Sequence, residues 1–437
     1  MATAVATQLE ELLRPLVKGD LPVRLEAWDG STAGPADAPV VRLNSPRALQ
    51  RILWSPGELG AAQAYVTGDL DIDGDLTQGL HHLWAVVRER NLSAVRPTPG
   101  MLVNAARTAR QLGAFGPRPS LPKTQIAVRG RLHSKRRDRE VIHHHYDLSN
   151  AFYSLILDAH MAYSCAYVTG ADLAGSETAD YTLEDAQADK LDLVCRKVGL
   201  DTRTGMRFLD IGCGWGSLSL YAAEHFGAQV TGVTISREQK AYIDGEIDRR
   251  GLGSLVEIRL QDYRDISDPP FDAVASLEMG EHVGERNYAT YAETLARCVR
   301  PEGRVLIQQM SRSGNRNRGG GPFIESFIAP DMTMRPIGET LNLLEAGGLE
   351  VRDVHALREH YVWTVRAWQQ RFEQHRAELT KLVGPEVIRV WDLYLAGGLL
   401  SFEQARMGVD QILMVRRDHG PSSLPAVRPT SWSTARA

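Results

Sequence analysis

The sequence Phe208-Leu-Asp-Ile-Gly-Cys-Gly-Trp-Gly216 joins a short hydrophobic run to three closely spaced glycines. The hydrophobic run predicts a buried strand, the glycines predict a tight turn, and residues 218–226 predict a helix. A strand, a glycine turn and a helix form the first unit of a doubly wound sheet, which binds ligands beyond the carboxyl ends of its strands. Glycine also lets the backbone approach a ligand closely. The stretch therefore predicts a nucleotide-like ligand at this turn.

The position of the acidic residues indicates which kind of nucleotide-like ligand is bound. An NAD site has its acidic residue about 20 residues after the glycines, at the end of the second strand. This sequence has Val233-Thr-Ile-Ser236 there, with no carboxylate. Asp210 instead ends the first strand, where it suits a ligand that carries hydroxyl groups or a positive charge. We therefore expect S-adenosylmethionine, with hydrogen bonds from Thr234, Ser236 and Gln239. An ordinary strand-end role is the alternative for Thr234.

Further strands and helices follow the glycine turn. Strands are expected at 229–235, 256–260, 271–276 and 304–309, and helices at 338–346, 361–383 and 385–408. Strands that alternate with helices are typical of an α/β domain with a parallel sheet. We therefore expect a doubly wound α/β fold for this part of the chain.

The composition is that of a globular protein. The chain has 437 residues, of which 43% are hydrophobic and 24% are charged, and this length predicts two domains. No apolar run of about 18 residues is present, so no transmembrane helix is expected, and the N-terminus does not resemble a signal peptide. Four widely spaced cysteines favour a reducing cytoplasm over a disulfide framework or a zinc site.

The chain divides into four segments. We expect a smaller α+β domain at 1–100, a linker at 101–128 with a helix at 102–112, the α/β domain at 129–420, and a disordered tail at 421–437. An acidic run that begins at Asp69 resembles the start of a calcium loop, but Leu80 stands where that loop needs a glutamate. We therefore expect no metal there, and an edge strand whose acidic side chains face solvent.

Basic residues are concentrated between 129 and 139. Such a run usually forms a solvated face. The alternative is attraction to an anionic membrane surface, worth about 1 kcal/mol per basic residue. No interleaved aromatic residues or known module support nucleic-acid binding, so none is expected.

Seven short motifs occur in one order between residues 140 and 405. They are His145-Tyr-Asp-Leu-Ser-Asn150, Tyr163-Ser-Cys-Ala-Tyr167, Leu209-Asp-Ile-Gly-Cys-Gly-Trp-Gly216, Gly232-Val-Thr-Ile-Ser-Arg-Glu-Gln239, Gln261-Asp-Tyr263, Glu281-His-Val-Gly284 and Pro301-Glu-Gly303. Together they resemble the cyclopropane-fatty-acid synthase family of S-adenosylmethionine-dependent methyltransferases. The resemblance implies a seven-stranded, Rossmann-like class I methyltransferase domain. Residues 45–76 also resemble the lipid-associated N-terminal domain of longer members.

The resemblance implies two groups of site residues. S-adenosylmethionine is expected among Tyr163, Ser164, Asp210, Gly212, Gly214, Thr234, Ser236, Gln239, Gln261, Asp262 and Tyr263. A bicarbonate ion, used as the general base, is expected to be held by Cys165, His145, Glu281 and Tyr361. Without the resemblance, Cys165 is a small buried hydrophobe, Glu281 a charge at a helix start and Tyr361 a packing residue.

The implied chemistry is methyl transfer to the cis double bond of an unsaturated acyl chain, such as oleoyl, in a membrane phospholipid. The resulting carbocation must be shielded from water, and a base then removes a proton. Cyclopropane-forming members typically have a histidine where Gln308 stands, and glutamine cannot carry a positive charge. We therefore expect a 10-methylene fatty acyl product, with a cyclopropane product as the alternative.

The resemblance also carries expectations about partners. We expect a homodimer at the inner face of the membrane, and a separate reductase that acts on the methylene product. The alternatives from other classes are a small-molecule or nucleic-acid methyltransferase on the same fold, and a lipid-binding protein without catalytic activity.

Overall fold

The computed structural model describes residues 4–92, 98–126, 133–135, 137, 149–314, 318–417 and 424–432. The chain forms two compact units. The first consists of Met1–Ile126, Pro322–Ile328 and Thr380–Leu400, and the second of Ala127–Gly321, Ala329–Leu379 and Ser401–Ala437. These bounds differ from the expected domains, because two segments from the C-terminal half belong to the first unit.

The first unit combines helices with a small sheet. Its helices are α1 (Val5–Leu13), α2 (Pro46–Trp54), α3 (Glu58–Val66), α4 (Leu76–Glu89), α5 (Pro99–Gln111), α12 (Pro322–Phe327) and the first part of α16 (Pro385–Glu403). Strands β1 (Arg24–Glu26), β2 (Thr32–Ala33), β3 (Val40–Leu43) and β4 (Leu70–Ile72) are ordered β2-β1-β3-β4.

The expected linker is part of the first unit's core. Helix α5 packs against α1, and Leu112, which follows α5, is buried in one cluster with Leu9, Leu25 and Leu43. Burial of these apolar side chains holds residues 99–112 against the sheet. A proline-containing stretch therefore continues the domain instead of separating it from the next one.

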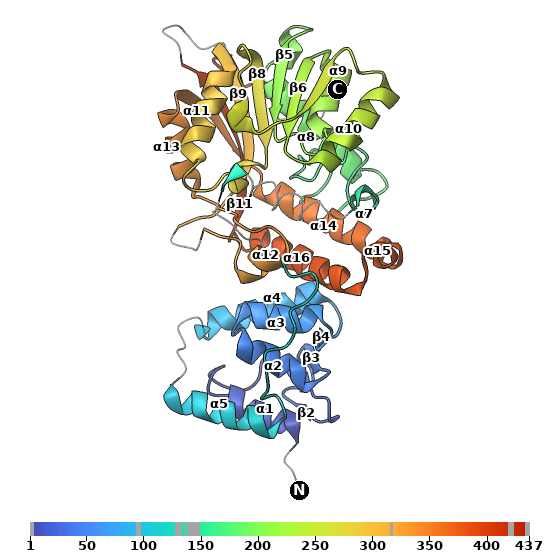
Figure 1. The fold of residues 1–437 in the computed structure, drawn as a ribbon, viewed down its shortest axis with the longest axis vertical. Helices are drawn as coiled ribbons and strands as arrows, with labels where there is room; N and C mark the ends of the chain where they lie inside the picture. The colour runs from blue at the N-terminus through green and yellow to red at the C-terminus, as the bar shows by residue number, and fades with distance from the viewer. Residues whose placement is uncertain are drawn as a thin grey trace. The chain divides into compact units, whose positions relative to one another are not determined.

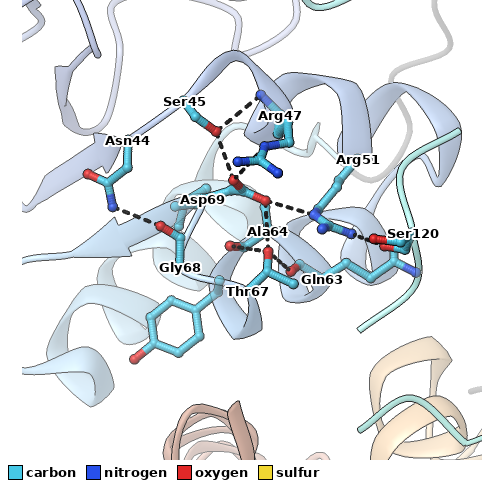
Figure 2. A network of polar contacts seen from close by, with 12 residues as sticks. Asn44, Ser45, Arg47, Arg51, Gln63, Ala64, Thr67, Gly68, Asp69 and Ser120 are labelled. Carbon is cyan, nitrogen blue, oxygen red and sulfur yellow. Dashed lines mark hydrogen bonds and ion pairs between the residues drawn. The ribbon is translucent and has the colours of Figure 1, made fainter. Parts of the chain in front are cut away.

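The acidic run around β4 is partly buried. Figure 2 shows that the Asp69 carboxylate accepts hydrogen bonds from Arg51 Nε at 2.9 Å, Ser45 Oγ at 2.8 Å and Thr67 Oγ1 at 2.9 Å. Burial alone would raise the pKa of Asp69, but these hydrogen bonds lower it below its usual value. The strand lies at the sheet edge as expected, but Asp69 faces inward because Arg51 is buried beside it. No His, Cys, Asp and Glu cluster suited to a metal occurs among the described residues.

The second unit contains a seven-stranded sheet, in the order β10-β11-β9-β8-β5-β6-β7. Its strands are β5 (Arg207–Ile211), β6 (Gln229–Thr234), β7 (Val256–Leu260), β8 (Phe271–Leu277), β9 (Val299–Ser311), β10 (Leu349–Ala356) and β11 (Gly408–Arg416). Strands β5 to β9 are parallel, whereas β11 runs antiparallel to β9 and β10. This confirms the doubly wound α/β fold, with the order reversing at β5.

Helices flank this sheet (Figure 1). The helices of the second unit are α7 (Asn150–Ser154), α8 (Leu183–Lys197), α9 (Ser217–Phe226), α10 (Arg237–Arg250), α11 (Tyr288–Cys298), α13 (Ile337–Ala346), α14 (Arg358–Gln374) and the first half of α15 (Arg376–Val383), whose second half belongs to the first unit. Helix α11 packs against α13, and α8 against α9. The central strands contribute fully buried residues such as Leu209, Val274 and Ile307 to one core cluster.

Two helix boundaries and the disorder of the tail differ from expectation in the second half of the chain. The helix expected at 361–383 is divided into α14 and α15 at His375, and the helix expected at 385–408 ends at Glu403. Strand β11 then begins at Gly408. The tail at 421–437 was expected to be disordered, but Trp432 is buried, and its turn, Thr430–Trp432, packs against α8. Burial of a large indole accounts for order there.

Candidate active site

The glycine turn between β5 and α9 has the conformation that its composition predicts. Gly212 has a φ of 77° and Gly214 a φ of 54°, which L-residues with side chains rarely adopt. A Cβ atom on Gly212 would also lie 3.0 Å from the Met279 side chain. At Gly214 a Cβ would meet no atom within 4 Å, so the backbone there borders open space. The turn thus presents bare backbone to a ligand.

One pocket lies at the carboxyl ends of β5 to β8. All but one of the residues expected to hold S-adenosylmethionine line it: Tyr163, Ser164, Asp210, Gly212, Gly214, Thr234, Gln239, Gln261, Asp262 and Tyr263. Ser236 is the exception; its Oγ accepts a hydrogen bond from Gln239 N at 3.2 Å and caps α10. Their contact with the cofactor stays a prediction.

The polar groups of the pocket are held by neighbouring side chains. The Asp210 carboxylate accepts a hydrogen bond from Ser219 Oγ at 2.7 Å, and burial raises its pKa to about 6. Thr234 Oγ1 donates to Gln239 Oε1 at 2.8 Å. Asp262 pairs with Arg264 at 2.6 Å. Carboxylates and an open glycine turn fit a ligand with ribose hydroxyls and a sulfonium charge, so the residues present fit S-adenosylmethionine.

A second carboxylate, Glu278, lies in the same pocket directly after β8. Its Oε1 accepts hydrogen bonds from Cys165 N at 2.7 Å and from Gln308 Nε2 at 2.8 Å. Its Oε2 accepts one from Tyr361 OH at 2.7 Å. Three donors from distant parts of the chain therefore converge on one side chain, which is partly accessible because it faces the pocket. Glu278 is not among the residues expected from the sequence.

The backbone holds Glu278 in an unusual conformation. Its φ is 49°, in the left-handed region that non-glycine residues rarely adopt, and its N–H donates to Gln308 O at 2.5 Å. Such strained residues cluster at functional sites, where the surrounding structure holds them. In this backbone conformation the Glu278 carboxylate lies within hydrogen-bond distance of its three donors.

The expected catalytic residues divide into two sets. Cys165, Gln308 and Tyr361 meet at Glu278, but Cys165 does so through its backbone. Its thiol donates to Ala166 O at 3.2 Å, and burial raises the thiol pKa well above its ordinary value. The thiol is thus engaged with carbonyl oxygens and not with Glu278.

Glu281 makes no hydrogen bond to this cluster. Glu281 is 1% exposed, and its carboxyl oxygens have no hydrogen-bond partner among the described residues. Burial and the neighbouring Glu278 charge raise the pKa of Glu281 well above its usual value. His145 lies outside the described residues.

These contacts do not fit a bicarbonate ion at the expected position. The Cys165 N–H, the Gln308 amide and the Tyr361 hydroxyl already donate to Glu278. A second anion in contact with this carboxylate would be repelled by it in a site of low dielectric. The three described donors at this position therefore bind a carboxylate of the chain itself.

Lys190 is a further residue that the sequence reading missed. It is fully buried on α8, and its Nζ donates to Ser164 Oγ at 2.9 Å. Burial lowers its pKa, while the charges of Glu278, Asp158 and Asp210 raise it. Lys190 lies four residues after the buried Ala186, and residues at this spacing share one face of a helix. A lysine on the apolar face of a helix is the signal that could have identified it. The signal for Glu278 is its place just after a hydrophobic strand.

Comparison with known proteins identifies the family of this chain. A family model described as mycolic acid cyclopropane synthetase matches residues 133–412. A probable fatty acid methyltransferase of Mycobacterium tuberculosis is 35% identical over 414 residues, covering 93% of this chain and 94% of the relative. A tuberculostearic acid methyltransferase of the same organism is 35% identical over 428 residues, covering 95% and 92%.

A solved structure shares the fold of the second unit. The crystal structure of a mycolic acid cyclopropane synthase complexed with S-adenosylhomocysteine and CTAB has a TM-score of 0.58 and 27% identity, and covers 63% of this chain and 98% of that one. The glycine turn, the pocket and these matches lead to one conclusion. The chain belongs to the cyclopropane-fatty-acid synthase family and is an S-adenosylmethionine-dependent methyltransferase.

Proposed function

We propose that the protein transfers a methyl group to the cis double bond of an oleoyl chain in a membrane phospholipid and yields a 10-methylene chain. The observation that carries the proposal is the convergence of Gln308, Tyr361 and Glu278 at the cofactor pocket. Two relatives that match nearly the whole chain are described as methyltransferases of a fatty acid and of tuberculostearic acid. These names support an acyl substrate.

The pocket residues suit chemistry through a carbocation. S-adenosylmethionine supplies the methyl group as an electrophile, and its sulfur keeps the electron pair of the broken C–S bond. Apolar residues, including Met161, Trp215, Leu277 and Val283, line the pocket beside the polar groups. They exclude water, which would otherwise add to a cationic acyl chain. The buried carboxylate of Glu278 offsets the positive charge that develops on the substrate.

Gln308 supports the methylene product over the cyclopropane. Its side chain is fully buried, and its Oε1 accepts a hydrogen bond from Gln411 Nε2 at 3.0 Å. The Gln411 Oε1 in turn accepts one from Lys197 Nζ at 2.9 Å. This chain orients the neutral Gln308 amide toward Glu278. A neutral donor leaves the proton acceptor less constrained than a histidine cation would.

The membrane surface is part of the proposal. None of the described helices has the length and hydrophobicity needed to cross a bilayer. Of the expected basic run, Lys135 pairs with Asp265 and Arg137 with Asp331, each at 2.5 Å. These two charges are paired within the second unit, and the other arginine residues of the run lie outside the described residues. We propose that the first unit, which resembles a lipid-associated domain, contributes to the attraction. Homodimer formation and a separate reductase stay proposals of the same kind.

The experiment is mass spectrometry of dioleoyl phospholipid vesicles after incubation with the purified protein and S-adenosylmethionine. The expected result is a mass gain of one CH2 unit and a product that ozone cleaves at an exocyclic double bond. A product with the same gain that resists ozone is a cyclopropane, which would replace the methylene proposal. A reaction without any gain would remove phospholipid as the substrate. Vesicles without the cofactor are the control.

A further inference from the structure

The family's chemistry needs a proton acceptor, and the structure offers one that belongs to the chain. Glu278 is the carboxylate that lines the cofactor pocket and accepts hydrogen bonds from three donors. Each donor lies on a different segment: Cys165 after α7, Gln308 on β9 and Tyr361 in the first turn of α14. The site is therefore built around a carboxylate group.

We propose that the Glu278 side chain is the general base of this enzyme and occupies the position at which bicarbonate was expected. This inference rests on the proposed function, because it assigns the proton-accepting step of that reaction. The assignment follows from the three hydrogen bonds that Glu278 accepts. Because the Cys165 N–H, the Gln308 amide and the Tyr361 hydroxyl all donate to Glu278, none of the three is left to bind a separate anion. The assignment also explains why position 278 keeps a glutamate at a φ of 49° that glycine would adopt without strain.

The two neighbouring carboxyl groups have different environments. Glu278 accepts three hydrogen bonds, which favour its ionised form, whereas Glu281 accepts none among the described residues. Burial raises the pKa of Glu278, and the bonds from Tyr361, Cys165 and Gln308 oppose that rise. A pair of close carboxyl groups separates in pKa in this way, and the one with donors ionises first. The three hydrogen bonds therefore favour Glu278 over Glu281 as the proton acceptor.

The proposed reaction consists of methyl transfer, hydride migration and loss of a proton. The π electrons of the acyl double bond form the new bond to the methyl carbon, and the adjacent acyl carbon becomes positive. A hydride moves from the methylated carbon to that carbon, which transfers the charge to the methylated position. A C–H bond of the new methyl group then breaks, and its electrons form the exocyclic double bond. The proton goes to a Glu278 carboxylate oxygen, and from there to solvent after the product leaves.

The first test measures binding and needs no turnover. Carbon-13 bicarbonate is titrated by NMR into the full-length protein loaded with S-adenosylhomocysteine. We expect no bound bicarbonate in the wild type or in Glu278→Gln, where a side chain still fills the site. We expect binding in Glu278→Gly, which frees the three donors and relieves the backbone strain. Specific binding by the wild type would overturn the proposal, whether or not the glycine variant folds.

Glu281→Gln is the matched control in this binding test. It replaces a neighbouring buried carboxyl that accepts none of the three hydrogen bonds. We expect this variant to leave bicarbonate excluded. Bicarbonate binding that appears in Glu281→Gln and not in Glu278→Gly would place the anion site elsewhere and contradict the proposal.

The second test measures turnover in buffer depleted of carbon dioxide and bicarbonate. We expect the wild type to keep its rate, and Glu278→Gln to lose about 100-fold or more, the usual effect of removing a general base. Glu278→Gly should be inactive in depleted buffer and regain turnover when bicarbonate is added. Wild-type activity that disappears on depletion, or a fully active Glu278→Gln, would overturn the inference.

The two tests separate this inference from the proposed function. If the wild type methylates no phospholipid, the proposed substrate fails, while the binding test still decides whether Glu278 occupies the anion position. If the wild type methylates phospholipid only with added bicarbonate, the proposed function holds and the assignment of Glu278 fails. The affinity of each variant for S-adenosylhomocysteine shows that its pocket is folded.

Discussion

At the scale of single residues, the site depends on which atom of each side chain is used. Cys165 contributes its backbone N–H, while its thiol bonds to carbonyl oxygens. Gln308 contributes an amide that donates to Glu278 and accepts from Gln411. Residue type alone suggests a thiol and an acid–base pair, but hydrogen-bond geometry assigns the polar contacts differently. Product choice and proton removal should therefore respond to changes at Gln308 and Tyr361.

Gln308→His is expected to shift the product from methylene toward cyclopropane. A histidine there can carry a positive charge that holds the proton acceptor more firmly and favours direct removal of a methyl proton. The ratio of ozone-sensitive to ozone-resistant product measures the shift. Gln308→Met, which has similar size and no donor, should lower the rate without changing the ratio. An unchanged ratio in the histidine variant would show that this residue does not select the product.

Tyr361→Phe is expected to lower turnover about 10- to 100-fold, because a hydrogen bond to a charged group contributes about 1.5–3 kcal/mol. The lost donor also raises the pKa of Glu278 further, since the Tyr361 hydroxyl lowers it. A base must be ionised to act, so activity falls when the pH drops below the pKa of Glu278. Because this pKa is higher in Tyr361→Phe, the variant should lose activity at a higher pH than the wild type. The pH–rate profile measures this. Tyr394→Phe, on α16, should leave the acid limb in place.

At the scale of elements, α14 determines where Tyr361 lies. The helix is anchored near its C-terminal end, where Arg371 pairs with Glu177 at 2.8 Å and with Glu184 at 2.5 Å and also donates to Leu157 O at 3.0 Å. These contacts attach α14 to the start of α8, the helix that carries Lys190. Near its N-terminal end, the Tyr361 ring packs on Phe402 with ring centroids 4.4 Å apart. The two anchors fix the helix on either side of the site.

Arg371→Met is expected to reduce the stability of the second unit by about 2 kcal/mol. It leaves the buried carboxylate of Glu177 and the partly exposed one of Glu184 without their cation, and solvent screens the charge of Glu184. The thermal unfolding midpoint measures it. Arg376→Met, next to the same helix, breaks an ion pair with Glu373 whose two side chains are both exposed. It should change stability by less than about 1 kcal/mol, and an equal loss in both variants would contradict the anchoring role of Arg371.

At the scale of the whole molecule, each unit has its own core and its own polar network. The first unit is organised around Asp69 and its buried partner Arg51, which also donates to Ser120 O at 2.9 Å (Figure 2). The second unit contains the seven-stranded sheet and all the residues that line the pocket. A ligand that binds the pocket should therefore shift the unfolding transition of the second unit, and a substitution in the core of the first unit should shift the transition of the first.

Arg51→Met is expected to destabilise the first unit by about 3–5 kcal/mol, because it removes the buried cation that lies 2.9 Å from the buried Asp69 carboxylate. S-adenosylhomocysteine at 100 times its Kd should stabilise the second unit by about 2.7 kcal/mol. Differential scanning calorimetry with and without this ligand resolves the two effects. Arg47→Met is the control, since Arg47 is exposed and lies 3.7 Å from the same carboxylate. A ligand affinity that falls in Arg51→Met would show that the pocket depends on the first unit.

Much of the architecture was predictable because it depends on local patterns. The hydrophobic run before the glycines specifies β5, and Ser45 followed by Pro46 specifies the start of α2. Strands β10 and β11 were not recognised individually. Strand β10 contains polar residues at many positions, and β11 follows a long helix with only a short break. Their place in the sheet depends on pairing with β9, which is distant in sequence.

The sequence alone determined the glycine turn and the α/β class, because backbone preference and strand-end position are local properties. The family and most of the residues that line the pocket came from the resemblance of its motifs, which are also local. Tertiary structure alone determined the role of Glu278. Its three donors are separated from it by 113, 30 and 83 positions along the chain. Convergence of groups so far apart arises from how β8, β9 and α14 pack, and no spacing rule within one segment encodes it.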